Sequence, residues 1–166
     1  MLEIDKHQLD YQLLTILEEQ LETAARAADT AKNGATHSES SAENKYDTFG
    51  LELSYLAQGQ SSRAHSLSKD ILWIKSRIQT SAIQPSTDKP YIGAIVSLCH
   101  KQRIDFYYIL PIAGGTSIMH NNILIRVITP HTALGAAILK ADLGEHVQLS
   151  SKCIGQNPHF EITDIH

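Results

Sequence analysis

The chain has 166 residues, of which 42% are hydrophobic and 19% charged, so it can bury one ordinary core, or a smaller core beside an elongated helical arm. Its formal net charge of −4 argues against direct binding to free DNA or RNA, because phosphate binding depends largely on clustered Lys and Arg. No apolar run approaches the roughly 20 residues that span a bilayer, and nothing near Met1 resembles a secretion signal. We therefore expect a cytoplasmic protein with no membrane partner.

The first half of the chain predicts two long helices, since none of the five prolines precedes Pro85. The first helix has an apolar seam with the 3,4 spacing of a heptad repeat, made of Leu14, Leu17, Leu21, Ala24 and Ala28. The second has a matching seam, made of Ala64, Leu67, Ile71, Ile74 and Ile78, which Leu53 and Leu56 extend backwards. Two such stripes joined by a short polar connection predict an antiparallel coiled-coil hairpin over residues 1–84.

Matching the two seams locates the turn of this hairpin. If Leu14 faces Ile71, and Ala28 faces Leu56 or Ala57, the fold-back centres near residues 42 and 43. Gly34 is then expected to end the first helix as a C-terminal cap. The arm from Leu14 to the turn is roughly 40 Å long at 1.5 Å per residue.

The second half, residues 90–166, predicts a small antiparallel β-sheet with one short helix. Five segments are rich in Ile, Val and Tyr and are bounded by turn residues: Tyr91–Cys99, Asp105–Ile112, Ile123–Ile128, His146–Leu149 and Phe160–Ile165. Thr132 is expected to cap a helix over Ala133–Leu139 after the break at Pro130. The chain as a whole is therefore predicted to be of the α+β class, with a boundary near residues 84–90.

The predicted tip of the hairpin, residues 37–47, is acidic. Glu39, Glu43 and Asp47 follow one another at intervals of four, so on a helix they would share one face. Carboxylates on a rigid support could complete the shell of a Mg²⁺ ion, which prefers oxygen ligands. The alternative is an ordinary solvated turn, in which acidic residues complement the dipole of a helix start.

Two segments resemble the GreA and GreB family of transcript cleavage factors. Ile128–Val147 is similar to the signature of the family's C-terminal domain, Ser-Pro-x-Ser-Pro-Leu-Gly-x-Ala-Leu-Leu-Gly-x-x-x-Gly-Asp-x-Val. Ala42–Tyr46 resembles part of the family's tip motif, Gly-Asp-Leu-Ser-Glu-Asn-Ala-Glu-Tyr. With the hairpin between them, the two matches span most of the chain.

The resemblance implies an FKBP-like C-terminal domain that docks on the rim of the secondary channel of bacterial RNA polymerase. The docking residues would be Thr129, Pro130, Leu134 and Gly135, and the tip residues at the polymerase active site would be Glu39, Glu43, Asn44 and Asp47. Glu39 and Glu43 would hold a Mg²⁺ ion shared with the polymerase. The protein would then promote cleavage of backtracked RNA by the polymerase and would not itself be an enzyme. It would be a monomer without a cofactor of its own, and it would contact nucleic acid only through the polymerase.

The tip departs from the family motif in a way that suggests a second function. Ser40 stands three positions before Glu43, where the family has an Asp, and Lys45 brings a positive charge beside the carboxylates. A secondary-channel regulator or inhibitor that does not stimulate cleavage therefore remains the alternative. A helical hairpin that binds some other partner is a third possibility.

Other activities find less support in the sequence. A prolyl isomerase pocket needs several aromatic walls, whereas the aromatic residues of the second half mostly occupy strand positions. The nine histidines are scattered without the spacing of zinc ligands. The glycine-rich segment Pro111–Thr116 lacks the lysine of a phosphate loop and is expected to be a hairpin turn, and Cys99 and Cys153 are expected to be reduced, mostly buried thiols.

Overall fold

The computed structural model describes residues 4–36, 48–80, 88–148 and 159–166. The chain divides into two compact units, which we call the hairpin unit, Asp10–Thr80, and the β-rich unit, Met1–Leu9 with Ser81–His166. The heptad pattern predicts a hairpin over residues 1–84, but the first nine residues group with the β-rich unit.

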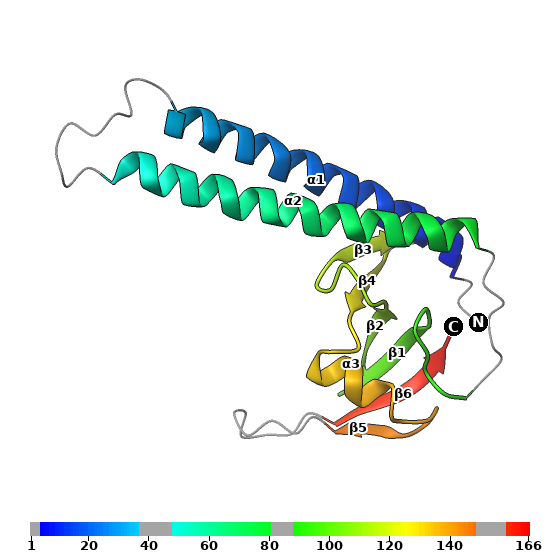
Figure 1. The fold of residues 1–166 in the computed structure, drawn as a ribbon. Helices are drawn as coiled ribbons and strands as arrows, with labels where there is room; N and C mark the ends of the chain where they lie inside the picture. The colour runs from blue at the N-terminus through cyan, green and yellow to red at the C-terminus, as the bar shows by residue number, and fades with distance from the viewer. Residues whose placement is uncertain (1–3, 37–47, 81–87, 149–158) are drawn as a thin grey trace. The chain divides into compact units, whose positions relative to one another are not determined.

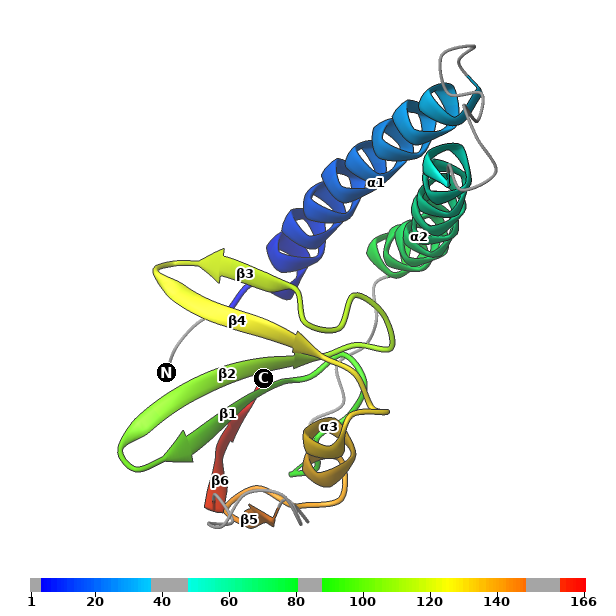
Figure 2. The ribbon, with the colours of Figure 1, turned by 90° about the vertical axis from the view of Figure 1, so that its left-hand side faces the viewer.

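Two helices of 31 residues each, α1 (Lys6–Thr36) and α2 (Phe49–Gln79), run antiparallel and side by side (Figures 1 and 2). The side chain of Asp5 caps α1, because its Oδ1 accepts hydrogen bonds from the backbone N–H of His7 and Gln8 at 2.9 and 3.1 Å. The predicted antiparallel hairpin is confirmed. Gly34, predicted to end the first helix, instead lies inside α1, two residues before its end.

The apolar seam of the hairpin follows the predicted heptads with a small change of register. Within the hairpin unit, the buried seam positions are Leu13, Leu17, Ala24, Ala28 and Ala31 in α1, and Leu67, Ile71 and Ile74 in α2. Leu14 and Leu21 are only half-buried, and Leu13 takes the innermost position in place of Leu14. In the distal part of α2, Ala57 is half-buried whereas Leu56 is 50% exposed, so the seam runs through Ala57.

The β-rich unit contains one six-stranded sheet in the order β3-β4-β2-β1-β6-β5. Its strands are β1 (Ile95–His100), β2 (Arg103–Ile109), β3 (Ser117–His120), β4 (Ile123–Ile128), β5 (His146–Gln148) and β6 (His159–Ile165). All neighbours are antiparallel except β2 and β4, which pair in parallel, so the sheet is mixed rather than wholly antiparallel as predicted.

The parallel pair arises from β3, a strand that the sequence did not reveal. After β2 the chain passes through residues 110–116 to the sheet edge, forms β3, and returns as β4 between β3 and β2. The segment Pro111–Thr116 is therefore a crossover and not a hairpin turn. The tight hairpin turns lie at Lys101–Gln102 and Asn121–Asn122, where both central residues have positive φ, between 47° and 66°.

Figure 2 shows α3 (Ala133–Ile138) beside the sheet, and one buried apolar cluster of the β-rich unit includes residues of both. Its buried members are Ala94, Val96, Leu98, Ile109, Ile128, Ile138, Ala141, Val147 and Ile162. Thr132 caps α3 as predicted, since its side chain accepts a hydrogen bond from the N–H of Gly135. The predicted fold class, α+β with a helical hairpin followed by a sheet and one short helix, is confirmed.

Candidate functional site

The acidic tip predicted from the sequence lies outside the described residues. This applies to all four tip residues, Glu39, Glu43, Asn44 and Asp47, and to the proposed Mg²⁺ ligands among them. The structure does describe the two helices that lead to this segment: α1 ends at Thr36 and α2 begins at Phe49, and residues 42 and 43 are midway between them. The described helix ends thus agree with the fold-back position that the seams predict.

The stem that supports this tip is held by contacts at both ends. Near the start of α1, Asp10 accepts a hydrogen bond from Nε of Arg77 at 2.9 Å, and about two turns further along α1 Glu18 pairs with Lys75 at 2.8 Å. At the distal end the helices approach so closely that a Cβ added at Gly34 would lie 2.9 Å from Cδ1 of Leu53. Gly34 therefore makes room for Leu53 within the hairpin, which explains a glycine inside a helix.

The predicted docking residues lie where the chain enters α3: Thr129 and Pro130 in the preceding turn, and Leu134 and Gly135 in the first turn of the helix. The carbonyl of Thr129 accepts hydrogen bonds from both the N–H and the hydroxyl of Thr132, at 3.1 and 2.8 Å. A Cβ at Gly135 would lie 2.1 Å from the same carbonyl oxygen, so no larger residue fits without moving the backbone. Leu134 packs partly against the core, and Pro130 is half-buried. Thr129 and Pro130 thus lie in a tightly bonded turn, and Leu134 and the buried Gly135 lie in the first turn of α3.

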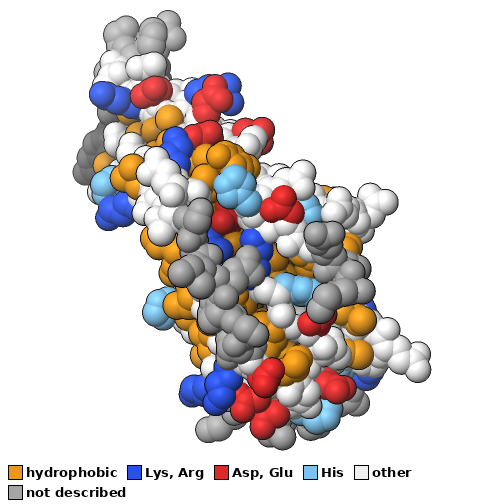
Figure 3. Space-filling view, turned by 90° about the vertical axis from the view of Figure 1, so that its right-hand side faces the viewer, with side chains coloured by type: hydrophobic (Ala, Val, Ile, Leu, Met, Phe, Trp, Pro, Cys, Tyr) orange, Lys and Arg blue, Asp and Glu red, His pale blue; other side chains and the backbone are white. Residues whose placement is uncertain are grey.

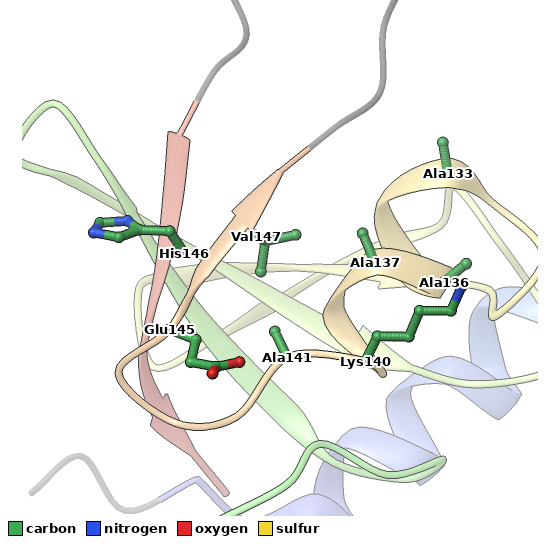
Figure 4. Close-up of a pocket in the computed structure, with 8 residues that line it drawn as sticks. All are labelled: Ala133, Ala136, Ala137, Lys140, Ala141, Glu145, His146 and Val147. Carbon is green, nitrogen blue, oxygen red and sulfur yellow. The ribbon is translucent and has the colours of Figure 1, made fainter.

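A shallow pocket of about 560 Å³ lies beside this turn, between α3 and β5 (Figure 4). Most of its lining is small and apolar, and three polar or charged residues complete it. The apolar residues are Ala133, Ala136, Ala137, Ala141 and Val147, and the others are Lys140, Glu145 and His146. Val147 and Ala137 face each other across the gap, whereas the His146 ring projects to the other side of β5 (Figure 4). The pocket has no convergent set of polar groups of the kind that orients a small ligand.

A charged cluster on β2 and β4 was not predicted from the sequence. Oδ1 of Asp105 in β2 accepts hydrogen bonds from Arg103 at 3.1 Å and from Arg126 of β4 at 3.0 Å. The hydrogen bond to Asp105 raises the pKa of the Arg126 guanidinium above its usual value, although partial burial acts in the opposite direction. The sequence did not predict this cluster because it did not predict that β2 pairs with β4. That pairing brings Asp105 and Arg126, 21 positions apart in the sequence, into contact.

Other expectations can be compared only in the described part of the chain. There, no group of three or more His, Cys, Asp or Glu side chains is arranged to hold a metal ion, and no helix is long and apolar enough to cross a membrane. Cys99 carries a free, half-buried thiol, and Cys153 lies outside the described residues. Lys and Arg side chains alternate with Asp and Glu over the helices on the face that Figure 3 presents, so no basic stripe for nucleic acid is visible there.

No protein-family model matches the chain, and neither does any curated protein. Among solved structures, GreA factor homolog 1 (Gfh1) of Thermus thermophilus is 17% identical, with 92% of this chain and 94% of that one covered and a TM-score of 0.35. A second structure, described as the transcription factor Gfh1, is 17% identical over 96% of this chain and 92% of that one, with a TM-score of 0.38. Gfh1 of Thermus aquaticus is 16% identical over 92% of each chain, with a TM-score of 0.37.

Proposed function

We propose that the protein is a regulator of bacterial RNA polymerase that inserts the tip of its helical hairpin into the secondary channel and promotes cleavage of backtracked RNA by the polymerase. One observation carries the proposal: α1 and α2 form a slender antiparallel stem whose distal ends flank the acidic segment that resembles the Gre tip motif. A helix of 31 residues is about 45 Å long, and two helices side by side are roughly 20 Å across. Such a rod reaches a site that a globular surface cannot approach.

The chain's own part in this activity is to deliver carboxylates. Glu39 and Glu43 offer oxygen ligands of the type that Mg²⁺ prefers, and in this proposal they would hold an ion shared with the polymerase active site. When bound, that ion would stabilise negative charge during phosphodiester cleavage. The bond would be broken in the polymerase, so in this proposal the protein needs no catalytic residue of its own.

The β-rich unit supplies docking in this proposal. Thr129, Pro130, Leu134 and Gly135 lie in the part of the chain that resembles the Gre C-terminal signature, and their turn is fixed by the hydrogen bonds of Thr132. A preorganised turn loses little conformational freedom on binding. We place the protein in the cytoplasm as a monomer, in contact with nucleic acid only through the polymerase.

A transcript-cleavage assay on stalled polymerase complexes tests the proposal. The wild-type chain should shorten the RNA from its 3′ end, and a variant with both Glu39→Ala and Glu43→Ala should still bind the polymerase but lose this effect. Glu22→Ala is the matched control, because Glu22 is an exposed carboxylate of α1 that pairs with Arg26 of the same helix at 3.4 Å. Cleavage that the double variant leaves unchanged would refute the role of the tip.

A second function, regulation without cleavage, is favoured by Ser40 and Lys45. Ser40 supplies no carboxylate where the Gre motif has one, and Lys45 partly neutralises its neighbours. Under this alternative the same assay shows binding and altered initiation or pausing, with no shortened RNA. If the wild-type chain does not bind the polymerase at all, both functions fail, and a hairpin module with another partner remains.

A further inference from the structure

One face of the sheet is covered by α3 at only one end. The buried cluster that includes residues of α3 also includes Ile109, the last residue of β2, and Ile128, the last residue of β4. α3 lies beside this end of β4, whereas β3 and the beginning of β4 extend away from it (Figures 1 and 2). Side chains two residues apart in a strand point to the same face, so Tyr107 and Arg126 continue the face of Ile109 and Ile128 away from α3.

Five side chains at the uncovered end of this face are grouped by contacts and strand pairing. Nη1 of Arg126 and Nη2 of Arg103 both donate hydrogen bonds to Oδ1 of Asp105, at 3.0 and 3.1 Å. Leu124 is two residues before Arg126 in β4, and Met119 of β3 is its cross-strand partner. We call these residues the β-face patch: Arg103, Asp105, Met119, Leu124 and Arg126. Ile104 is also exposed but, by the alternation of β2, belongs to the opposite face.

The β-face patch offers both apolar and basic groups to a partner. Met119 is 62% exposed and Leu124 40%, and the side chain of Arg103 is 71% exposed. Directly opposed side chains on neighbouring strands are in contact, so Met119 and Leu124 form one apolar surface beside the guanidinium groups. Met and Arg are both enriched in protein–protein interfaces relative to the rest of a protein surface.

The charges of the β-face patch favour a partner that carries carboxylates. Residues 95–128, which contain β1 to β4, have three basic residues, Lys101, Arg103 and Arg126, but only one acidic residue, Asp105. The whole chain is the reverse, with 14 Lys and Arg against 18 Asp and Glu. Because Arg103 and Arg126 share a single oxygen of Asp105, one positive charge of this trio is left over, and most N–H groups of the two guanidiniums are left for a further acceptor.

Two features favour an acidic protein segment over nucleic acid as this partner. Met119 and Leu124 offer nothing that a phosphate binds, and three basic residues are few for a surface that must hold a phosphate backbone. The patch also continues the predicted docking surface, because Arg126 is only three residues before Thr129. A protein that docks on the turn before α3 can therefore extend along β4 onto the patch.

We infer that the β-face patch binds an acidic segment of RNA polymerase in which an apolar side chain is flanked by Asp or Glu. The apolar side chain would cover Met119 and Leu124, and the carboxylates would accept hydrogen bonds from Arg103 and Arg126. This inference rests on the proposed function and extends the docking contact from the turn before α3 onto the sheet.

The test measures the affinity of the full chain for bacterial core RNA polymerase in solution, at low and high salt. Arg103→Glu should weaken binding about tenfold or more at low salt and lessen the salt dependence of the affinity, because repulsion replaces attraction. Met119→Ser should weaken binding about fivefold at both salt concentrations, since an apolar contact is not screened. Thermal unfolding should show that each variant folds.

Two matched controls make the same chemical changes at exposed positions of the β-rich unit outside the patch. Lys89→Glu reverses the charge of a side chain that is 69% exposed, and Ile92→Ser removes an apolar side chain from a residue that is 51% exposed. Each control should change the affinity for the polymerase less than about twofold, because most surface positions contribute little to binding.

The outcomes separate this inference from the proposed function. If the wild type binds the polymerase and the patch variants bind as tightly as the controls, the β-face patch has no role, although the regulator function stands. If Arg103→Glu and Lys89→Glu weaken binding equally, net charge and not the patch is responsible, and the inference is overturned. Binding of the wild type to a short RNA without polymerase, abolished by Arg103→Glu, would identify nucleic acid as the partner and overturn it as well. If the wild type does not bind the polymerase, the proposed function fails and the inference fails with it.

Discussion

Asp10 and Arg77 lie 67 residues apart in the sequence, and Nε of Arg77 donates a hydrogen bond of 2.9 Å to Oδ2 of Asp10. Both side chains are largely withdrawn from solvent, with 7% of Asp10 and 18% of Arg77 exposed. The contact joins the beginning of α1 to the end of α2, at the end of the hairpin remote from its tip. It fixes the register of two helices whose apolar stripes would tolerate other alignments.

Asp10→Asn should therefore destabilise the hairpin unit. Removal of the Asp10 charge leaves the positive charge of Arg77 without its partner in a largely buried position. We expect the free energy of unfolding to fall by about 2 kcal/mol. Glu18→Gln is the control, because Glu18 and Lys75 are each about half exposed and such pairs contribute about 0.5 kcal/mol or less. Trp73, the only tryptophan of the chain, lies in α2, so urea unfolding followed by its fluorescence reports on this unit. Equal losses in the two variants would contradict the assigned role.

Two glycine substitutions should have opposite effects on stability. Gly135→Ala brings a methyl group to 2.1 Å from the Thr129 carbonyl oxygen, and we expect the β-rich unit to lose about 2 to 3 kcal/mol. Gly59→Ala introduces a methyl group with no atom within 4 Å inside a helix, and should stabilise the hairpin unit by about 0.5 to 1 kcal/mol. Amide hydrogen exchange in β1 and β4 measures the first effect, and Trp73 fluorescence measures the second. A Gly135→Ala variant of wild-type stability would show that the turn before α3 can relax.

Thr132→Ala should loosen the same turn without creating a clash. The Thr132 hydroxyl donates to the Thr129 carbonyl and accepts from the N–H of Gly135 at 3.0 Å, and its removal should cost about 1 kcal/mol. Thr132→Ser keeps both hydrogen bonds and should behave like the wild type. If the turn docks on the polymerase, Thr132→Ala should also weaken binding, whereas Thr132→Ser should not. Hydrogen exchange of the Gly135 amide and a polymerase affinity measurement together check both statements.

Asp105→Asn should reveal what the charged cluster on the sheet contributes. Asp105 is shielded and accepts from two arginines, so loss of its charge should reduce the stability of the β-rich unit by about 1 kcal/mol, an effect that high salt should diminish. Arg103→Ala removes the 71% exposed partner and should change stability little. Thermal unfolding at low and high ionic strength measures both. If Arg103→Ala lowered the stability of the β-rich unit more than Asp105→Asn, the prediction would be wrong.

The hairpin could be predicted closely because each helix is defined by the spacing of apolar residues within a single stretch of sequence. Heptad spacing of Leu, Ile and Ala defines both helices and their antiparallel pairing, and errors are confined to neighbouring residues, such as Leu13 in place of Leu14. Leu56 illustrates the limit, since a single helix turn offers two apolar residues, Leu56 and Ala57, and only packing decides which one faces the partner.

The sheet was harder to predict because its pairings are not local. β3 has four residues, Ser117–His120, and lacks the run of Val and Ile that marks β4. It ends in His120, a polar residue that is nevertheless buried, with 3% of its surface exposed. The turns at Lys101–Gln102 and Asn121–Asn122 lack the glycine that usually signals positive φ, whereas the glycines of the segment 111–116 suggested a turn where the chain crosses over. The docking residues were predicted through resemblance to a motif.

The chain enters the hairpin unit at Asp10 and leaves it at Thr80, and residues on both sides of that stretch belong to the β-rich unit, where Nζ of Lys6 donates a hydrogen bond to the Tyr91 hydroxyl at 3.0 Å. In topological terms the hairpin is an insertion within a discontinuous domain. Its length is therefore an independent variable of the molecule: removal of one heptad from each helix would shorten the stem by roughly 10 Å while the seam stays in phase. Insertion or deletion of whole heptads would therefore change the length of the hairpin unit while its apolar seam stays in register.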